Sequence, residues 1–126
     1  MKKHIFSGSV FEEKYGHSRA VVAGDTIYVS GTTGYDYATG ALPEEAAEQT
    51  RQTFRNIEAA LHQAGASLHD LVQIVTYFTD PDDWDAIGAV LRDELQGIHP
   101  ANSGVRVALI DPAMKVEISA IAVRSA

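Results

Sequence analysis

The sequence has 126 residues, no cysteine and a formal net charge of −7, and this length predicts a single domain over residues 1–126. Without cysteine the chain has neither a disulfide nor a cysteine-ligated zinc site, which suits a reducing, cytoplasmic compartment. The negative charge opposes phosphate neutralisation, so no nucleic-acid partner is expected. Because no apolar stretch approaches the roughly 20 residues of a transmembrane helix, no membrane partner is expected either.

The first third of the chain is predicted to form β-structure. Residues 5–10 are a candidate strand. Residues 18–23 and 26–30 are predicted to form a hairpin, because β-branched and aromatic residues flank a Gly-Asp turn dipeptide. The following residues, 31–42, are rich in Thr, Gly and Asp and are predicted to form a loop.

Two amphipathic helices are predicted next. The first covers residues 43–64, since Pro43 suits a first helical position and Gly65 can end the helix. A three-to-four spacing predicts that one face packs on a sheet, through Ala46, Thr50, Thr53, Phe54, Ile57, Ala60, Leu61 and Ala64. The second helix begins after Asp80, which can cap it, and ends near Gly97.

Three further strands are predicted over residues 71–79, 102–110 and 114–124. The last two are predicted to pair as a hairpin across an Asp-Pro turn. The resulting order, β-β-β-α-β-α-β-β, indicates an α+β fold with one sheet and two helices on one face. The other face of the sheet would be small and semi-polar, and such a face predicts pairing with further copies of the chain.

Several short segments occur in the order and at the spacing of one known family. They are IYVSG (27–31), EQTRQ (48–52), NI (56–57), AGASL (64–68), TD (79–80) and KVEISAIA (115–122). Over about residues 14–124 the chain therefore resembles the RidA/YjgF/YER057c/UK114 family. The resemblance implies a chorismate-mutase-like fold and a homotrimer whose sheets close a central barrel. It also implies pockets at the subunit interfaces and cofactor-free hydrolysis of enamines or imines to a 2-oxo acid and ammonia.

The positions that carry the family's chemistry differ in this chain. The arginine that binds the substrate carboxylate falls on Asn102, and the glutamate that holds the attacking water falls on Ser119. A frequent cysteine falls on Gly104, and a pocket tyrosine falls on or near Ser18. The chain thus resembles an atypical member that lacks the usual catalytic arginine.

The catalytic candidates are His17, Ser119 and Glu117. His17 precedes the hairpin, and histidine is the side chain that exchanges a proton near neutral pH. An exposed loop histidine is the alternative for this position. Glu117 retains the first acid of the family's Glu-Ile-Glu pattern.

Two segments hold the candidate ligand-binding residues: Ser30, Gly31 and Thr32 in the glycine-rich loop, and Asn102, Ser103 and Arg106 in the penultimate strand. In the family the loop lines the pocket, where its backbone N–H groups can hold a carboxylate. Arg106 could bring a guanidinium to the pocket. Alternatively it forms a cross-strand ion pair with Glu117 in the predicted hairpin. Arg19 and Arg51 are further candidate cations, and solvated charges are the alternative for both.

Two functions are compatible with these residues. The first is binding of a small carboxylated metabolite at subunit interfaces, with deaminase-like hydrolysis of an enamine or imine. The alternative is a non-catalytic ligand-binding or regulatory trimer. The histidines lack metal-ligand spacing, so neither a metal nor another cofactor is expected. The family's older description as a ribonuclease is disfavoured by the net charge of −7.

Overall fold

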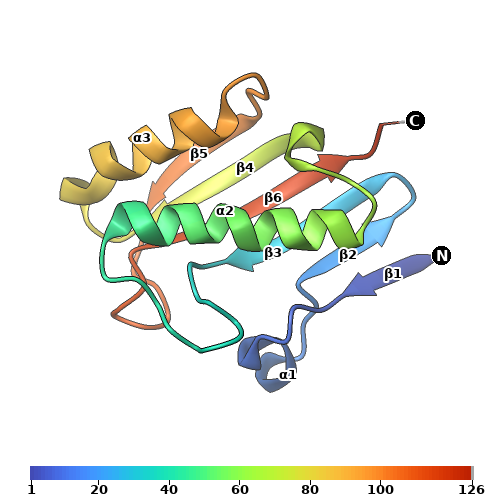
Figure 1. The fold of residues 1–126 in the computed structure, drawn as a ribbon, viewed down its shortest axis with the longest axis horizontal. Coiled ribbons are helices and arrows are strands. Elements are labelled where there is room, and N and C mark those ends of the chain that lie inside the picture. The colour runs from blue at the N-terminus through green and yellow to red at the C-terminus, as the bar shows by residue number, and fades with distance from the viewer. Residues whose placement is uncertain (126) are drawn as a thin grey trace.

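The computed structural model describes residues 1–125 and places one mixed sheet behind two long helices (Figure 1). The strand order is β1-β2-β3-β6-β4-β5, and only the β4–β5 pair is parallel. The strands are β1 (Lys2–Ile5), β2 (Ala20–Ala23), β3 (Thr26–Thr32), β4 (Leu71–Phe78), β5 (Ala101–Arg106) and β6 (Val116–Val123).

The helices are α1 (Val10–Tyr15), α2 (Ala46–Gln63) and α3 (Trp84–Leu95). Figure 1 shows α2 and α3 crossing the same face of the sheet. Every residue of the predicted α2 stripe is buried, from Ala46 to Ala64. The predicted α+β class and the order of its strands and two long helices are therefore confirmed, with α1 as an additional element.

The N-terminal prediction was partly wrong, because a strand ends and a helix begins inside the predicted segment. Ile5 closes β1, and Val10 starts α1. The side chain of Ser9 caps this helix by accepting the Phe11 N–H at 3.3 Å. Gly16, at φ 73°, ends it in the left-handed region that favours glycine. The start of α2 was also misplaced, because the helix begins at Ala46 and not at Pro43.

The predicted C-terminal hairpin was also wrong. Strand β5 runs parallel to β4, with Arg106 opposite Phe78, and β6 pairs with β3 and β4 instead. The reason is the helix between β4 and β5, because a strand–helix–strand crossover returns the chain parallel to its start. Strand β4 thus separates Arg106 from Glu117, and the predicted ion pair between them does not form.

The face of the sheet away from the two long helices lies open. Along β6 the buried residues Val116, Ile118 and Ala120 alternate with partly exposed Glu117 and Ser119. Three apolar side chains are exposed on neighbouring strands, Tyr28 on β3, Val105 on β5 and Val123 on β6. The core accordingly occupies only the layer between the sheet and the helices.

Gly104 is packed against an aromatic ring at the start of α3. A Cβ atom at this position would lie 2.8 Å from Cη2 of Trp84. The Trp84 ring packs in turn on Phe78, with centroids 4.6 Å apart. The indole therefore takes the space that a side chain at residue 104 would need.

The Gly104→Cys variant should lower the free energy of unfolding by about 1–3 kcal/mol, because overpacking forces Trp84 or the strand to move. Urea denaturation measures this loss, and Ser103→Cys, on the exposed neighbouring position, is the matched control. Equal stability of the two variants would contradict the tight Gly104–Trp84 contact.

Candidate functional site

A pocket of about 240 Å³ lies beside the end of β3. Its walls come from α1, the segment before β2, the loop after β3, and the start of β6. It brings together three residues of the predicted site, His17, Gly31 and Glu117, and the candidate cation Arg19. The other side chains at its wall include Phe11, Tyr15, Tyr37, Ile110 and Met114.

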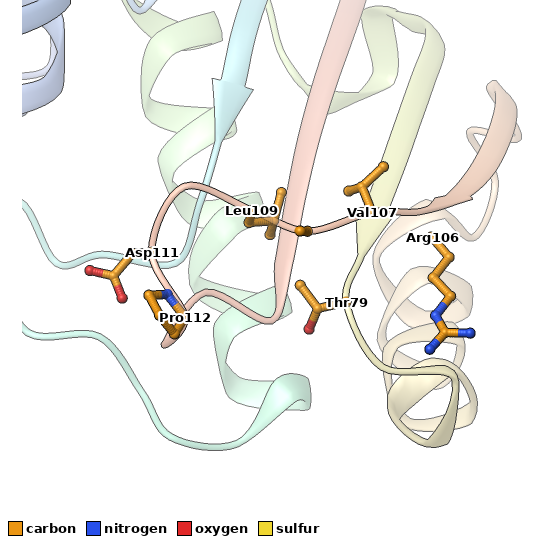
Figure 2. A pocket seen from close by; sticks show the side chains of 7 residues that line it. Thr79, Arg106, Val107, Leu109, Asp111 and Pro112 are labelled. Carbon is orange, nitrogen blue, oxygen red and sulfur yellow. The ribbon is translucent and has the colours of Figure 1, made fainter.

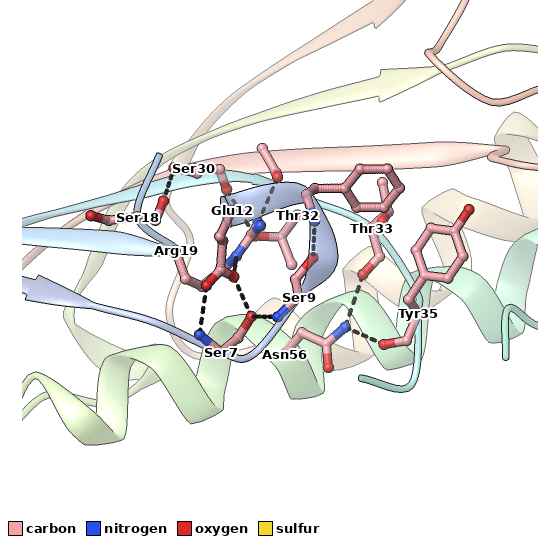
Figure 3. Close-up of polar contacts among 12 residues, drawn as sticks. Ser7, Ser9, Glu12, Ser18, Arg19, Ser30, Thr32, Thr33, Tyr35 and Asn56 are labelled. Atoms are coloured by element: carbon pink, nitrogen blue, oxygen red, sulfur yellow. Dashed lines mark hydrogen bonds and ion pairs between the residues drawn. The ribbon is translucent and has the colours of Figure 1, made fainter. Parts of the chain in front are cut away.

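A buried arginine organises one side of this pocket (Figure 3). Arg19 donates from Nε to Oε2 of Glu12 at 3.1 Å. Its Nη1 donates to the Gly31 carbonyl at 2.7 Å and to Oγ1 of Thr32 at 3.0 Å. These bonds connect α1 to the end of β3, so the guanidinium is held in one orientation.

Glu12 is the anion of this network and is itself buried. Ser7 bonds both carboxylate oxygens, through its backbone N–H at 2.9 Å and through its hydroxyl. Burial acts to raise the pKa of Glu12, but the Ser7 hydrogen bonds and the Arg19 guanidinium outweigh it and hold the pKa below its usual value. The Glu12 carboxyl is therefore ionised at neutral pH and balances the charge of Arg19.

Glu117 is the carboxyl that lines the pocket, and its surroundings differ from those of Glu12. A Cβ atom on Gly31 would lie 2.6 Å from Oε2 of Glu117, so the carboxyl lies directly over this glycine. Burial raises the pKa of Glu117, although the Arg19 charge acts in the opposite direction. The pKa values of the two carboxyls are therefore shifted in opposite directions, downward for Glu12 and upward for Glu117.

Two polar side chains of α2 hold the segments around the pocket. Asn56 donates from Nδ2 to the carbonyls of Thr33 and Tyr35, at 2.9 and 2.8 Å. Gln49 donates to the Ala113 carbonyl and accepts the Lys115 N–H, which fixes the approach to β6. The loop after β3 and the start of β6 are therefore positioned by the long helix.

The other predicted loop residues have structural roles. Ser30 donates from Oγ to the Ser18 carbonyl at 2.7 Å. Thr32 is buried and donates from Oγ1 to the Ser30 carbonyl at 2.8 Å. Of the three predicted ligand-binding residues of this loop, Gly31 borders the pocket, and Thr33, two residues further on, borders it as well.

The structure does not bring the predicted β5 residues to this pocket. Asn102 and Ser103 are exposed, and Asn102 accepts a hydrogen bond from buried Thr76 at 3.1 Å. Ser119 lies in a separate hollow on the open sheet face, together with Tyr28 and Val75.

Arg106 lines a different hollow, with a volume of about 610 Å³. Figure 2 shows Arg106 and Asp111 at opposite ends of it. No salt bridge of Arg106 is found among residues 1–125.

Two residues of this site have a larger role than their sequence pattern indicates. Arg19 was a candidate cation with a solvated charge as the alternative, and the structure excludes the solvated alternative because only 3% of Arg19 is exposed. The sequence does contain a pattern that involves its partner Glu12. Ser9 and Glu12 are three residues apart, as in the Ser-x-x-Glu motif typical of a helix start. Tyr37 contributes a ring whose centroid lies 5.9 Å from Cζ of Arg19, and burial raises the pKa of its hydroxyl.

Within residues 1–125, no cluster of three or more His, Asp or Glu side chains is placed to hold a metal ion. None of the helices in the same range is both long enough and apolar enough to span a membrane.

Comparison with known proteins identifies the family. The model of the family described as Endoribonuclease L-PSP matches residues 10–124. The chain belongs to this family. It is the RidA/YjgF/UK114 family that the sequence motifs indicate, and the chorismate-mutase-like fold expected from the resemblance is confirmed.

This RidA-like chain is similar to a named deaminase and to several solved structures. The 2-iminobutanoate/2-iminopropanoate deaminase of Capra hircus is 35% identical over 109 residues, which cover 86% of this chain and 80% of the relative. A YjgF/YER057c/UK114 family structure from Mycobacterium tuberculosis is 42% identical, with a TM-score of 0.89 and coverage of 98% and 99%. Escherichia coli TdcF with bound serine is 30% identical, with a TM-score of 0.81 and coverage of 86% and 88%.

Glu12→Gln should lower the free energy of unfolding at pH 7 by about 3–5 kcal/mol, because it leaves the buried Arg19 charge unbalanced. Since the folded-state pKa of Glu12 lies below its usual value, the contribution is present above about pH 4.5 and is lost as the pH falls through the folded-state pKa. Urea denaturation at several pH values measures this difference. Glu13→Gln, on the exposed side of the same helix, is the control, and equal losses in both variants would contradict the buried pair.

Proposed function

We propose that this RidA-like chain hydrolyses the C=N bond of a small carboxylated imine or enamine, bound in the pocket around Gly31 and Glu117. The observation that carries the proposal is the half-buried Glu117 carboxyl, whose pKa burial raises and which shares the pocket with His17. A carboxyl that is neutral at higher pH than usual can donate a proton and then take one back.

The reaction requires these two transfers in order. Neutral Glu117 donates a proton to the imine nitrogen while the oxygen of a water molecule bonds to the adjacent carbon. The water proton passes to the Glu117 carboxylate, which leaves a carbinolamine. A second donation to the amino group and removal of the hydroxyl proton break the C–N bond, releasing ammonia and the 2-oxo acid. His17, at the pocket wall, is proposed as the second proton-transfer group.

The substrate class is supported by the relatives. One is named a deaminase of 2-iminobutanoate and 2-iminopropanoate, and another has been solved with bound serine. Each of these small molecules carries a carboxylate and a nitrogen on the neighbouring carbon. A pocket of about 240 Å³ has room for a molecule of this size.

The family's usual arginine and second glutamate are replaced here by the uncharged residues Asn102 and Ser119. This observation favours a second candidate, a trimer that binds the ligand without turnover. The two functions share the pocket and differ only in whether Glu117 and His17 transfer protons.

We further propose that the chain forms a homotrimer through the open face of its sheet. The exposed apolar side chains on this face, Tyr28, Val105 and Val123, support the proposal because an uncovered sheet face gains stability when it is buried. A trimer of this kind would place the hollow around Ser119, and one side of the Glu117 pocket, next to a neighbouring copy.

Glu117→Gln should reduce turnover by roughly 10²- to 10⁴-fold, the usual contribution of a general acid–base group. The substrate, 2-iminobutanoate, is generated in situ with an amino-acid oxidase, and the imine that remains is trapped with semicarbazide. In the wild type, turnover should fall as the pH rises through the pKa of Glu117. The His17→Ala variant should have a lower turnover than the wild type at every pH. Glu48→Gln, on exposed α2, is the control. Saturable binding without turnover in the wild type would favour the second candidate.

Tyr28→Glu should dissociate the trimer, because three acidic side chains would be brought together on the buried sheet faces. Sedimentation equilibrium should give about three chain masses for the wild type and one for the variant. His62→Glu introduces the same charge on the opposite, helical side and should leave the trimer intact. A monomeric wild type would refute the assembly.

A further inference from the structure

Arg19 is the only arginine of the pocket among residues 1–125, and its orientation is fixed. The Nε group donates to Glu12, while Nη1 donates to the Gly31 carbonyl and to Thr32. An arginine has five N–H groups, and these bonds use the one on Nε and two on Nη1. No hydrogen bond from Nη2 to a described residue is found, so its two N–H groups have no protein acceptor within residues 1–125.

The two N–H groups of Nη2 form one edge of the guanidinium, and the position of this edge determines where a ligand can bind. Arg19 is 97% buried, yet it belongs to the pocket wall, so contact with a ligand is confined to a small part of the guanidinium. Its Nη1 bonds the carbonyl of Gly31, and the Glu117 carboxyl lies over the same glycine. A ligand held by Arg19 would therefore have its neighbouring atoms on the side of Glu117.

The charges of the pocket agree with an anionic ligand. Glu12 balances Arg19 from the protein side, and its carboxylate accepts hydrogen bonds from Ser7 and Arg19. Glu117 is the acid at the pocket wall, and burial raises its pKa. An incoming carboxylate meets two guanidinium N–H donors that have no acceptor within residues 1–125.

We infer that the Nη2 edge of Arg19 binds the carboxylate of the ligand, so that the segment just before β2 supplies the cation for which the family uses the position of Asn102 on β5. The inference deepens the proposed function and rests on its pocket. Arg106 is the rival cation, but it lies at the end of β5 in another hollow, with β4 between it and Glu117. In this chain the carboxylate-binding group would thus come from the segment before β2 and not from β5.

Binding of 2-oxobutanoate, the stable product of the proposed reaction, tests the inference by isothermal titration calorimetry. The double variant Glu12→Gln/Arg19→Met removes the buried ion pair as a unit, which avoids leaving one charge unbalanced. Its affinity should fall about 10- to 100-fold, the contribution of charge-assisted hydrogen bonds. Arg106→Met loses the same charge at the rival position and should bind as the wild type does. The methyl ester of 2-oxobutanoate should bind the wild type as weakly as the acid binds the double variant.

A measurement on the wild type covers the case in which the double variant does not fold. In protein labelled with ¹⁵N-arginine, 2-oxobutanoate should shift the side-chain N–H signal of Arg19 and leave that of Arg106 in place. Arg19→Lys, which keeps the charge but loses the planar edge, assigns the signal and should bind more weakly. A shift of the Arg106 signal alone, unchanged affinity in a folded double variant, or no saturable binding to the wild type would each overturn the inference.

The inference and the proposed function fail in different ways. If Glu117→Gln keeps its affinity for 2-oxobutanoate and the wild type shows no turnover, the hydrolase proposal fails and the role of Arg19 stands. If turnover depends on Glu117 but the double variant retains the wild-type KM, hydrolysis stands and Arg19 does not bind the carboxylate.

Discussion

The buried ion pair between Arg19 and Glu12 is the constraint on which the pocket depends. Removing two opposite charges from water is costly unless hydrogen bonds occupy the remaining donors and acceptors. Ser7, Gly31 and Thr32 supply those bonds, and in doing so they join α1, the segment before β2 and the end of β3. The N-terminal helix is thereby attached to the sheet by electrostatics rather than by a large apolar contact. The same requirement holds the guanidinium rigid, which prepares its remaining edge for a ligand.

Two positions at which the sequence predicts a departure from the family's pattern, residues 102 and 104, make specific contacts in this structure. At Gly104 the missing side chain leaves space that Trp84 occupies. At Asn102 the amide oxygen accepts a hydrogen bond from buried Thr76, a role that a guanidinium could not take. A cysteine at residue 104 would therefore collide with Trp84, and an arginine at residue 102 would leave the Thr76 hydroxyl without this acceptor. Residues 102 and 104 both lie on β5, an exposed edge strand, whereas the apolar core is formed by the α2 stripe and the inner face of β6.

The fold followed from the sequence wherever periodicity decided it. The α2 stripe and the alternation along β4 and β6 depend only on local spacing, so these elements were predicted well. Strand partners are not local, and the parallel β4–β5 pair therefore replaced an expected hairpin. The site was predicted in part: His17, Gly31 and Glu117 share the pocket, whereas Asn102, Ser103, Arg106 and Ser119 do not line it. Arg19 was undervalued because nothing in the linear pattern shows that a charged side chain will be enclosed by residues 7, 12, 31 and 32.

The central position of β6 has a consequence for how the chain folds as it is made. Strand β6 lies between β3 and β4 in the sheet, although it comes after both of them in sequence. Until residues 116–123 emerge from the ribosome, β3 and β4 each lack a partner on one side, and the inner positions that Ile118 and Ala120 fill are open. Exposed strand edges of this kind invite pairing with other chains. A nascent chain of this topology therefore passes its most aggregation-prone stage late in synthesis, just before the sheet closes.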